Sequence, residues 1–320
     1  MDGQFTPYVH APICATSPLE GICFAAYDAE IGFVSEAYPS RESQSLYGQA
    51  TVNIDDANRA IFGFRYTEDE FSSNVTNFFG LQQYLIQDEL DETTGRIAYE
   101  RDLDEDTMVY VSYTKGFKPG GSNLTFGWPV DDEREFGALP APQLVFPLFQ
   151  SEMIDAFEVG LKTDFLEGRM RANISAFAYD YENLQFQSTD PDVYRGGVAN
   201  IPESEMSGVE LEFTALISDN LTFDMNLASI DSEVSADYEV LDNVLAFGYF
   251  FGEEDLRYAL RENVKGNELA KTPDFTADLT MTYETVLASG NSFTTILQYI
   301  KRSEFMQRVS NNRVVDVVPG

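Results

Sequence analysis

The residue types that usually perform catalysis are scarce or undistinguished in this sequence. His10 is the only histidine, so a site built from several histidines is excluded and a serine or cysteine nucleophile has little support. Aspartate and glutamate total 54, and so many carboxylates form close pairs throughout the chain without marking one acid–base pair. We therefore predict no catalytic residues, no metal site, no cofactor and no enzymatic activity.

Two short segments resemble ion- or phosphate-binding loops only in part. Residues 102–106 begin like a calcium loop, but Thr107 stands where that loop needs glycine and Tyr113 where it needs a bidentate glutamate. The glycine-rich segment 115–121 lacks the Gly-Lys-Ser/Thr order of a nucleotide-binding loop. We interpret the first segment as a solvated turn and the second as a turn that leaves a strand.

The only two cysteines, Cys14 and Cys23, lie close together in the sequence and are separated by Pro18 and Gly21. This spacing permits a small disulfide-closed loop in an oxidising compartment. Two unpaired thiols are the alternative interpretation.

The elements that must position any site are β-strands, because apolar and polar residues alternate with a period of two through most of the chain. Abundant phenylalanine and tyrosine, 25 and 17 residues, also favour strands over helices. The alternating runs approach the roughly 9 to 11 residues of tilted transmembrane strands. About ten strands are expected; their ranges are Leu46 to Ile54, Arg59 to Thr67, Gly95 to Arg101, Thr107 to Lys115, Ala156 to Phe165, Arg169 to Tyr181, Gly208 to Ile217, Leu221 to Ser232, Phe275 to Tyr283 and Ser292 to Ile300.

The connections between these strands alternate between short turns and long polar segments. The short turns are residues 55–58, 102–106, 166–168, 218–220 and 286–291, and the long segments are 68–94, 116–153, 182–207 and 233–273. Outer-membrane barrels have short periplasmic turns and long extracellular loops. This pattern predicts an antiparallel transmembrane β-barrel and places residues 1–45, with both cysteines, on the outer side.

Side-chain chemistry also differs between the two faces of each expected strand. Within a bilayer the lipid-facing side must be apolar and every backbone group must be paired. We therefore expect the apolar residues to face lipid. The charged residues of the opposite face would line a wet lumen, namely Glu158, Lys162, Asp164, Glu210, Glu212 and Asp278.

The net charge and the first residues of the chain further limit which classes of protein fit the sequence. The formal net charge of -34 opposes nucleic-acid binding, since phosphate contacts supply most of that affinity. No apolar run approaches the roughly 18 residues of a membrane helix, and residues 1–4 lack the features of a signal peptide. Because an outer-membrane protein must be exported, we expect Met1 not to be the natural start.

Several motifs occur together in the order of one known family. The segment from Val109 to Gly121 resembles a barrel strand and following loop of TonB-dependent outer-membrane receptors. Residues 157–163 with 172–181 are similar to that family's next hairpin, with a Glu-x-Gly-x-Lys strand. Further similar segments are 60–67, 200–202, 207–212 and 272–275, so the resemblance covers most of the chain from about Leu46 onward.

This resemblance implies a partial barrel, with about ten strands of an expected 22, over residues 46–320. Barrels of that size are plugged transporters. It also implies uptake of a scarce nutrient, such as a ferric siderophore or another chelate. We find no TonB box, plug domain or closing C-terminal strand in the sequence, and we expect the chain to be a fragment.

The expected partners follow from the same resemblance. They are outer-membrane lipid and lipopolysaccharide, a small-molecule ligand such as an iron chelate, and the TonB complex through a plug domain missing from this chain. Trp128, Tyr194 and Arg195 lie in expected outer loops and are candidate ligand contacts. The alternatives are an exported soluble all-β binding or adhesion protein and, with less support, a general porin.

Overall fold

A computed structural model describes residues 36–77, 82–123, 126–127, 143–144, 148–190, 195–241 and 261–320. Its described elements are all strands: β1 (Glu36–Asn53), β2 (Asn58–Asn77), β3 (Gln82–Asp102), β4 (Thr107–Lys118), β5 (Phe126–Gly127), β6 (Gln143–Leu144), β7 (Glu152–Phe165), β8 (Met170–Asp190), β9 (Arg195–Ser218), β10 (Leu221–Val234), β11 (Glu239–Leu241), β12 (Arg261–Asn263), β13 (Phe275–Val286), β14 (Ser292–Arg302), β15 (Phe305–Met306) and β16 (Val317–Val318). Among these residues no helix is long and apolar enough to cross a membrane.

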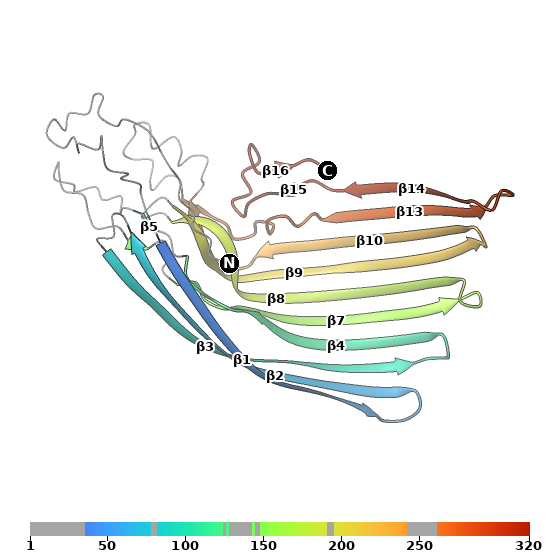
Figure 1. Cartoon of the computed structure of the whole chain (residues 1–320), viewed down its shortest axis with the longest axis horizontal. Coiled ribbons are helices and arrows are strands. Elements are labelled where there is room, and N and C mark those ends of the chain that lie inside the picture. Colours follow the sequence, from blue (N-terminus) through green and yellow to red (C-terminus); the bar gives the residue numbers. More distant parts are fainter. Residues whose placement is uncertain are drawn as a thin grey trace. The chain divides into compact units, whose positions relative to one another are not determined.

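Ten of the strands form one sheet in which each long strand pairs with the next along the chain. The order is β1-β2-β3-β4-β7-β8-β9-β10-β13-β14, and neighbouring strands from β3 onward in this order are antiparallel (Figure 1). All ten strands expected from the sequence are present, and the antiparallel all-β class is confirmed.

The expected strand limits are wrong on the side of the long connections. Residues 68–94 and 182–207, expected as loops, belong mostly to strands, since β2 runs to Asn77, β8 runs to Asp190 and β9 begins at Arg195. β1 likewise begins at Glu36 rather than Leu46. Hydrophobic alternation marks only the part of a strand that needs an apolar face, whereas backbone pairing continues among polar residues.

The short turns occur where the sequence places them. In the turn between β1 and β2, the Ile54 N–H donates to the Asn58 carbonyl at 2.8 Å. The Asp55 carboxylate accepts from the Ala57 N–H at 2.9 Å and from the Asn58 amide at 2.6 Å. These bonds lower the pKa of Asp55, the Ala57 N–H contributing most. An aspartate that accepts from the backbone two residues later is a frequent turn device.

The described residues divide into two compact units. In the first, which contains residues 36–43, 69–77 and 82–90, the Arg41 guanidinium donates to the buried Asp69 carboxylate at 2.6 Å. Arg41 also lies 5.7 Å from the centre of the Phe71 ring. The ion pair is therefore held against apolar surface, where solvent screens it less.

In the second unit the main apolar core lies beside the sheet, among the connections, and not between two layers. It contains Ile201 of β9, Val234 of β10 and four residues of later segments, Val240, Val264, Leu269 and Val309. The segment after β14 is held by Asp316, which is fully buried and accepts from Arg308 at 2.6 Å and from Ser310 at 2.8 Å. The strand pattern did not predict this core, because its members come from segments that are separated in the sequence.

Candidate functional site

One face of the sheet is apolar across successive strands. Directly paired residues of an antiparallel ladder point to the same face. Val111 pairs with Val159, Val159 with Ala176, and Ala176 with Val209. Val159 and Val209 remain 47% and 50% exposed although both lie within strands. An extended apolar surface of this kind marks contact with an apolar medium or partner.

The opposite face carries the ionisable residues. Lys162 pairs with Asn173, Asn173 with Glu212, Glu212 with Asn226, and Asn226 with Asp278. This ladder crosses five strands and shares its face with Glu158, Asp164 and Glu210, which stand at even steps along β7 and β9. The sequence prediction that these six charged residues share one face is confirmed.

Neighbouring strands join these groups by polar contacts. The Arg59 guanidinium of β2 lies 2.5 Å from Glu100 and 2.8 Å from Asp102, both of β3. Arg171 donates to both carboxylate oxygens of Asp164, at 2.7 and 2.9 Å. The sequence reasoning did not single out Arg59 or Arg171, because nothing in the spacing shows which cross-strand acid each would meet.

Three amide or hydroxyl contacts extend the same network toward β14. Asn173 donates to Glu212 at 3.1 Å, and Gln298 donates to the two oxygens of Asp278 at 2.9 and 3.1 Å. The Thr214 hydroxyl donates to Asp224 at 2.8 Å. A face with this many hydrogen-bonded ionisable groups is suited to contact with water or with a polar partner.

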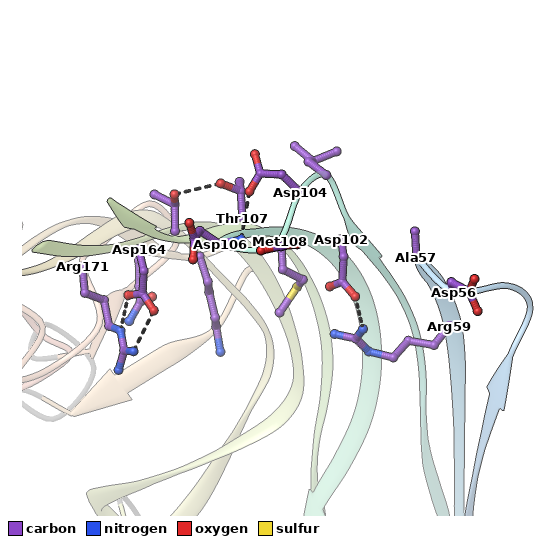
Figure 2. Close-up of a pocket in the computed structure, with 15 residues that line it drawn as sticks. Asp56, Ala57, Arg59, Asp102, Asp104, Asp106, Thr107, Met108, Asp164 and Arg171 are labelled. Atoms are coloured by element: carbon purple, nitrogen blue, oxygen red, sulfur yellow. Dashed lines mark hydrogen bonds and ion pairs between the residues drawn. The ribbon is translucent and has the colours of Figure 1, made fainter. Parts of the chain in front are cut away.

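An open hollow of about 810 Å³ lies where this face meets the short turns (Figure 2). It is bounded by the Arg59–Asp102 pair, the Asp164–Arg171 pair and the turn between β3 and β4. Its remaining lining residues are Asp56, Ala57, Leu103, Asp104, Glu105, Asp106, Thr107, Met108, Lys162, Thr163 and Asn173. The lining offers charged and polar contacts without a nucleophile–base pair, so it is suited to packing against a polar surface and not to covalent chemistry.

Residues 103–106 form the expected turn, and Asp102 belongs to the end of β3. The Asp106 N–H donates to Asp104 Oδ1 at 2.9 Å, and the Leu103 N–H donates to the Thr107 carbonyl at 2.8 Å. The described residues contain no group of three or more histidine, cysteine, aspartate or glutamate side chains placed to hold a metal ion.

A tyrosine and a glycine pack closely on the polar face. The Tyr110 ring covers Gly160 of the next strand, where a Cβ atom would overlap the ring. The Tyr110 hydroxyl donates to Glu158 at 2.5 Å, and Lys162 Nζ lies 5.6 Å from the ring centre. A glycine inside a strand pattern signals close approach of another group, and that signal could have identified this contact from the sequence.

The candidate ligand contacts are only partly within the described residues. Arg195 begins β9 and pairs with Asp190 at the end of the β8–β9 hairpin. Trp128, Tyr194, Cys14 and Cys23 lie outside the described residues.

Comparison with known proteins identifies the family. The family model described as "TonB dependent receptor-like, beta-barrel" matches residues 21–319. The chain belongs to this family. Its members are outer-membrane transport receptors and not enzymes. The alternative of a soluble binding or adhesion protein is not favoured.

Two curated relatives cover part of this barrel chain. The chain is 26% identical over 194 residues to the "Probable TonB-dependent siderophore receptor PiuA" of Acinetobacter baumannii. The matched region covers 61% of this chain and 24% of that protein. The chain is 22% identical over 204 residues to the "Metal-pseudopaline receptor CntO" of Pseudomonas aeruginosa, covering 62% of this chain and 25% of the relative. The match therefore spans about a quarter of each relative's length.

Solved structures of the family share the fold. The ferric yersiniabactin uptake receptor FyuA from Yersinia pestis superimposes with a TM-score of 0.66 at 17% identity, covering 87% of this chain and 37% of that chain. The siderophore receptor PiuA from Acinetobacter baumannii gives a TM-score of 0.64 at 21% identity, covering 88% and 35%. At these identities the likeness supports the barrel fold alone.

Proposed function

We propose that the protein imports an iron chelate, such as a ferric siderophore, across the outer membrane without covalent chemistry. The observation that carries this proposal is the separation of the two sheet faces in a chain of the TonB-dependent receptor family. One face carries the exposed side chains Val159 and Val209, which we propose contact lipid, and the other carries the ladder from Lys162 to Asp278, which we propose lines the interior. The relatives are named as siderophore and metal-pseudopaline receptors, and their names support this ligand class.

The wall chemistry suits passage of a polar solute. Arg171–Asp164 and Arg59–Asp102 are ion pairs, whereas Glu212 and Asp278 are bonded to neutral amides, so a passing chelate would meet a hydrated and predominantly acidic surface. We further propose that the ligand is contacted first at the outer ends of the strands, by Arg195 with Trp128 and Tyr194. Energy coupling would come from the TonB complex acting through a plug domain.

Uptake by cells tests this function. The gene that encodes the chain is deleted in its source strain, and uptake of ⁵⁵Fe(III) is measured under iron limitation from that strain's own siderophore-containing spent medium. We expect uptake from this medium to fall in the deletion strain, to return with the wild-type gene, and to require an energised inner membrane. Unchanged uptake in the deletion strain, with related receptors also deleted, would contradict the proposal.

A further inference from the structure

The long connection between β4 and β7 is closed at its base, where residues 119–123 lie against residues 149–151; we call these two segments the neck. The chain leaves β4 at Lys118 and returns at Glu152, and between them Gly121 and Phe149 form an isolated antiparallel bridge with backbone bonds of 3.0 and 2.8 Å. A Cβ atom on Gly120 would overlap the Phe149 carbonyl, so only glycine fits there. The Lys-Pro-Gly-Gly motif therefore makes a tight neck and not merely a turn at the end of a strand.

Two amide side chains of the β8–β9 hairpin hold this neck. Gln185 and Asn200 are direct cross-strand partners, so they project from the same face of the hairpin. Both donate to the Gln150 carbonyl, each at 3.1 Å, and the Gln150 N–H donates to Asn200 Oδ1 at 2.7 Å. Gln185 also donates to the Pro119 carbonyl at 3.0 Å, on the other strand of the neck. The pair thus contacts both sides of the neck.

A third amide reaches the hairpin from the neck itself. Asn123 donates to the Val198 carbonyl at 2.9 Å and accepts from the Val198 N–H at 2.6 Å. It satisfies both backbone polar groups of a β9 residue, as a residue of a neighbouring strand would. We call Asn123, Gln185 and Asn200 the amide cluster.

The amide cluster joins the neck to the β8–β9 hairpin. Its bonds join residues more than thirty positions apart in sequence, such as Asn123 with Val198 and Gln150 with Asn200. All lie on the side of the long connections, which in this family is the extracellular side. Neutral amides are suited to this role because their bonds persist over the whole range of pH and salt that a cell surface meets.

We propose that the amide cluster consists of positioning residues, which fasten the base of the β4–β7 connection to the β8–β9 hairpin and so fix the relative positions from which the ligand-contacting segments start. The proposal deepens the proposed function, because it assigns ligand affinity at the outer face to residues that do not touch the ligand. A receptor that fixes the bases of its binding segments before the ligand arrives loses less conformational entropy on binding.

Hydrogen exchange of the full-length receptor in detergent or nanodiscs, without ligand, tests the fastening directly. The Val198 and Gln150 amides both donate to side chains of the amide cluster. In Asn123→Ala and Asn200→Ala respectively, we expect the peptide containing the affected amide to exchange about fivefold faster, since one such bond is worth about 1 kcal/mol. Gln187→Ala is the matched control, because it removes an exposed amide from the same hairpin. Equal exchange in the variants and the control would overturn the proposal.

Uptake kinetics separate a positioning role from a purely structural one. The probe is ⁵⁵Fe(III) bound by the siderophores of the source strain's spent medium, supplied over a range of concentrations to cells carrying each variant. For Asn123→Ala and Asn200→Ala we expect the half-saturating concentration to rise about fivefold, which corresponds to one lost bond, with an unchanged maximal rate and an unchanged amount of folded receptor in the outer membrane. Asn123→Gln restores an amide and should recover part of the affinity.

Failure of this proposal is distinguishable from failure of the proposed function. If uptake depends on the gene but the variants match Gln187→Ala in half-saturating concentration, the amide cluster has no positioning role. If uptake does not depend on the gene, the import function is wrong, and the exchange experiment alone decides whether the segments are fastened.

Discussion

Arginine placed on the lipid-facing side of β7 should destabilise the protein far more than arginine on the interior side. Val159 lies within β7 between Val111 and Ala176, and about half of its surface is uncovered in the described residues. If that half contacts acyl chains, Val159→Arg must bring a guanidinium into hydrocarbon or distort the bilayer around it.

The expected magnitude follows from this location. Arginine or lysine on the lipid face of an outer-membrane barrel costs about 2–4 kcal/mol near the bilayer midplane. That cost corresponds to a decrease of the folding equilibrium constant by about 30-fold to 1,000-fold. The same substitution at a half-exposed site in water usually changes the free energy of unfolding by less than about 0.5 kcal/mol.

Asn226→Arg is the matched control on the interior face. Asn226 is exposed and pairs with Glu212 on one side and Asp278 on the other, so the new guanidinium would lie between two carboxylates. We expect no loss of stability, or a small gain. The assay is reversible urea unfolding of the full-length receptor in lipid vesicles, with heat-modifiable mobility in gels as a second readout. Equal effects of Val159→Arg and Asn226→Arg would refute the assignment of the two faces.

Three further predictions concern packing and charge. Gly160→Ala should lower the free energy of unfolding by about 1–3 kcal/mol, and much less in a Tyr110→Ala background, because the new methyl group meets the Tyr110 ring. Asp316→Ala should speed exchange of the Asn312 amide about tenfold, since that N–H donates to Asp316 Oδ2 at 2.9 Å. The pKa of Glu268 is raised above its ordinary 4.5, mainly by burial and next by the nearby Asp274 carboxylate. The charged form of Glu268 therefore opposes folding. Local stability should increase as the pH falls from above the raised pKa to below 4.5. Glu268→Gln should therefore slow exchange of neighbouring amides at pH 7 and have no effect below pH ~4, where the wild-type carboxyl is also neutral.

Each of these predictions has an outcome that contradicts it. An equal cost of Gly160→Ala with and without the Tyr110 ring would show that the ring is not the obstacle. For Asp316, removal of the exposed Glu304–Arg313 pair, 3.6 Å apart, is the control and should leave exchange unchanged; an effect as large as that of Asp316→Ala would contradict the role of burial. If Glu268→Gln changed the exchange of neighbouring amides equally at pH 4 and pH 7, the raised pKa of Glu268 would be contradicted.

The sequence predicted the part of the fold that the membrane dictates. A strand that must present an apolar face to lipid shows alternation, so Gly208 to Ile217 was identified as a strand and Glu210 and Glu212 were assigned to one face. The short turns followed from aspartate, asparagine and glycine at fixed positions, as at Asp55. Both signals are local, which is why a single sequence contains them.

Contacts between distant residues could not be predicted in the same way. The continuation of β8 to Asp190 alternates only briefly, at Leu184 and Phe186, and these two side chains pack against the apolar core of the connections, which the sequence did not predict. The partners of Arg59 and the bonds of Gln185 to the neck depend on strand register and on where a long connection returns. One sequence carries no direct information on either.

The measurement that tests the central claim most directly is the accessibility of spin labels on neighbouring residues of β9. Labels replace Leu211 and Glu212 one at a time in the full-length receptor in lipid bilayers, and relaxation is measured with oxygen, which partitions into lipid, and with a water-soluble nickel chelate. We predict that Leu211 is accessible to oxygen and shielded from nickel, and that Glu212 is accessible to nickel. A label at Leu211 that neither reagent reaches, with Glu212 exposed to ordinary bulk water on the outside of the protein, would contradict the membrane-spanning assignment.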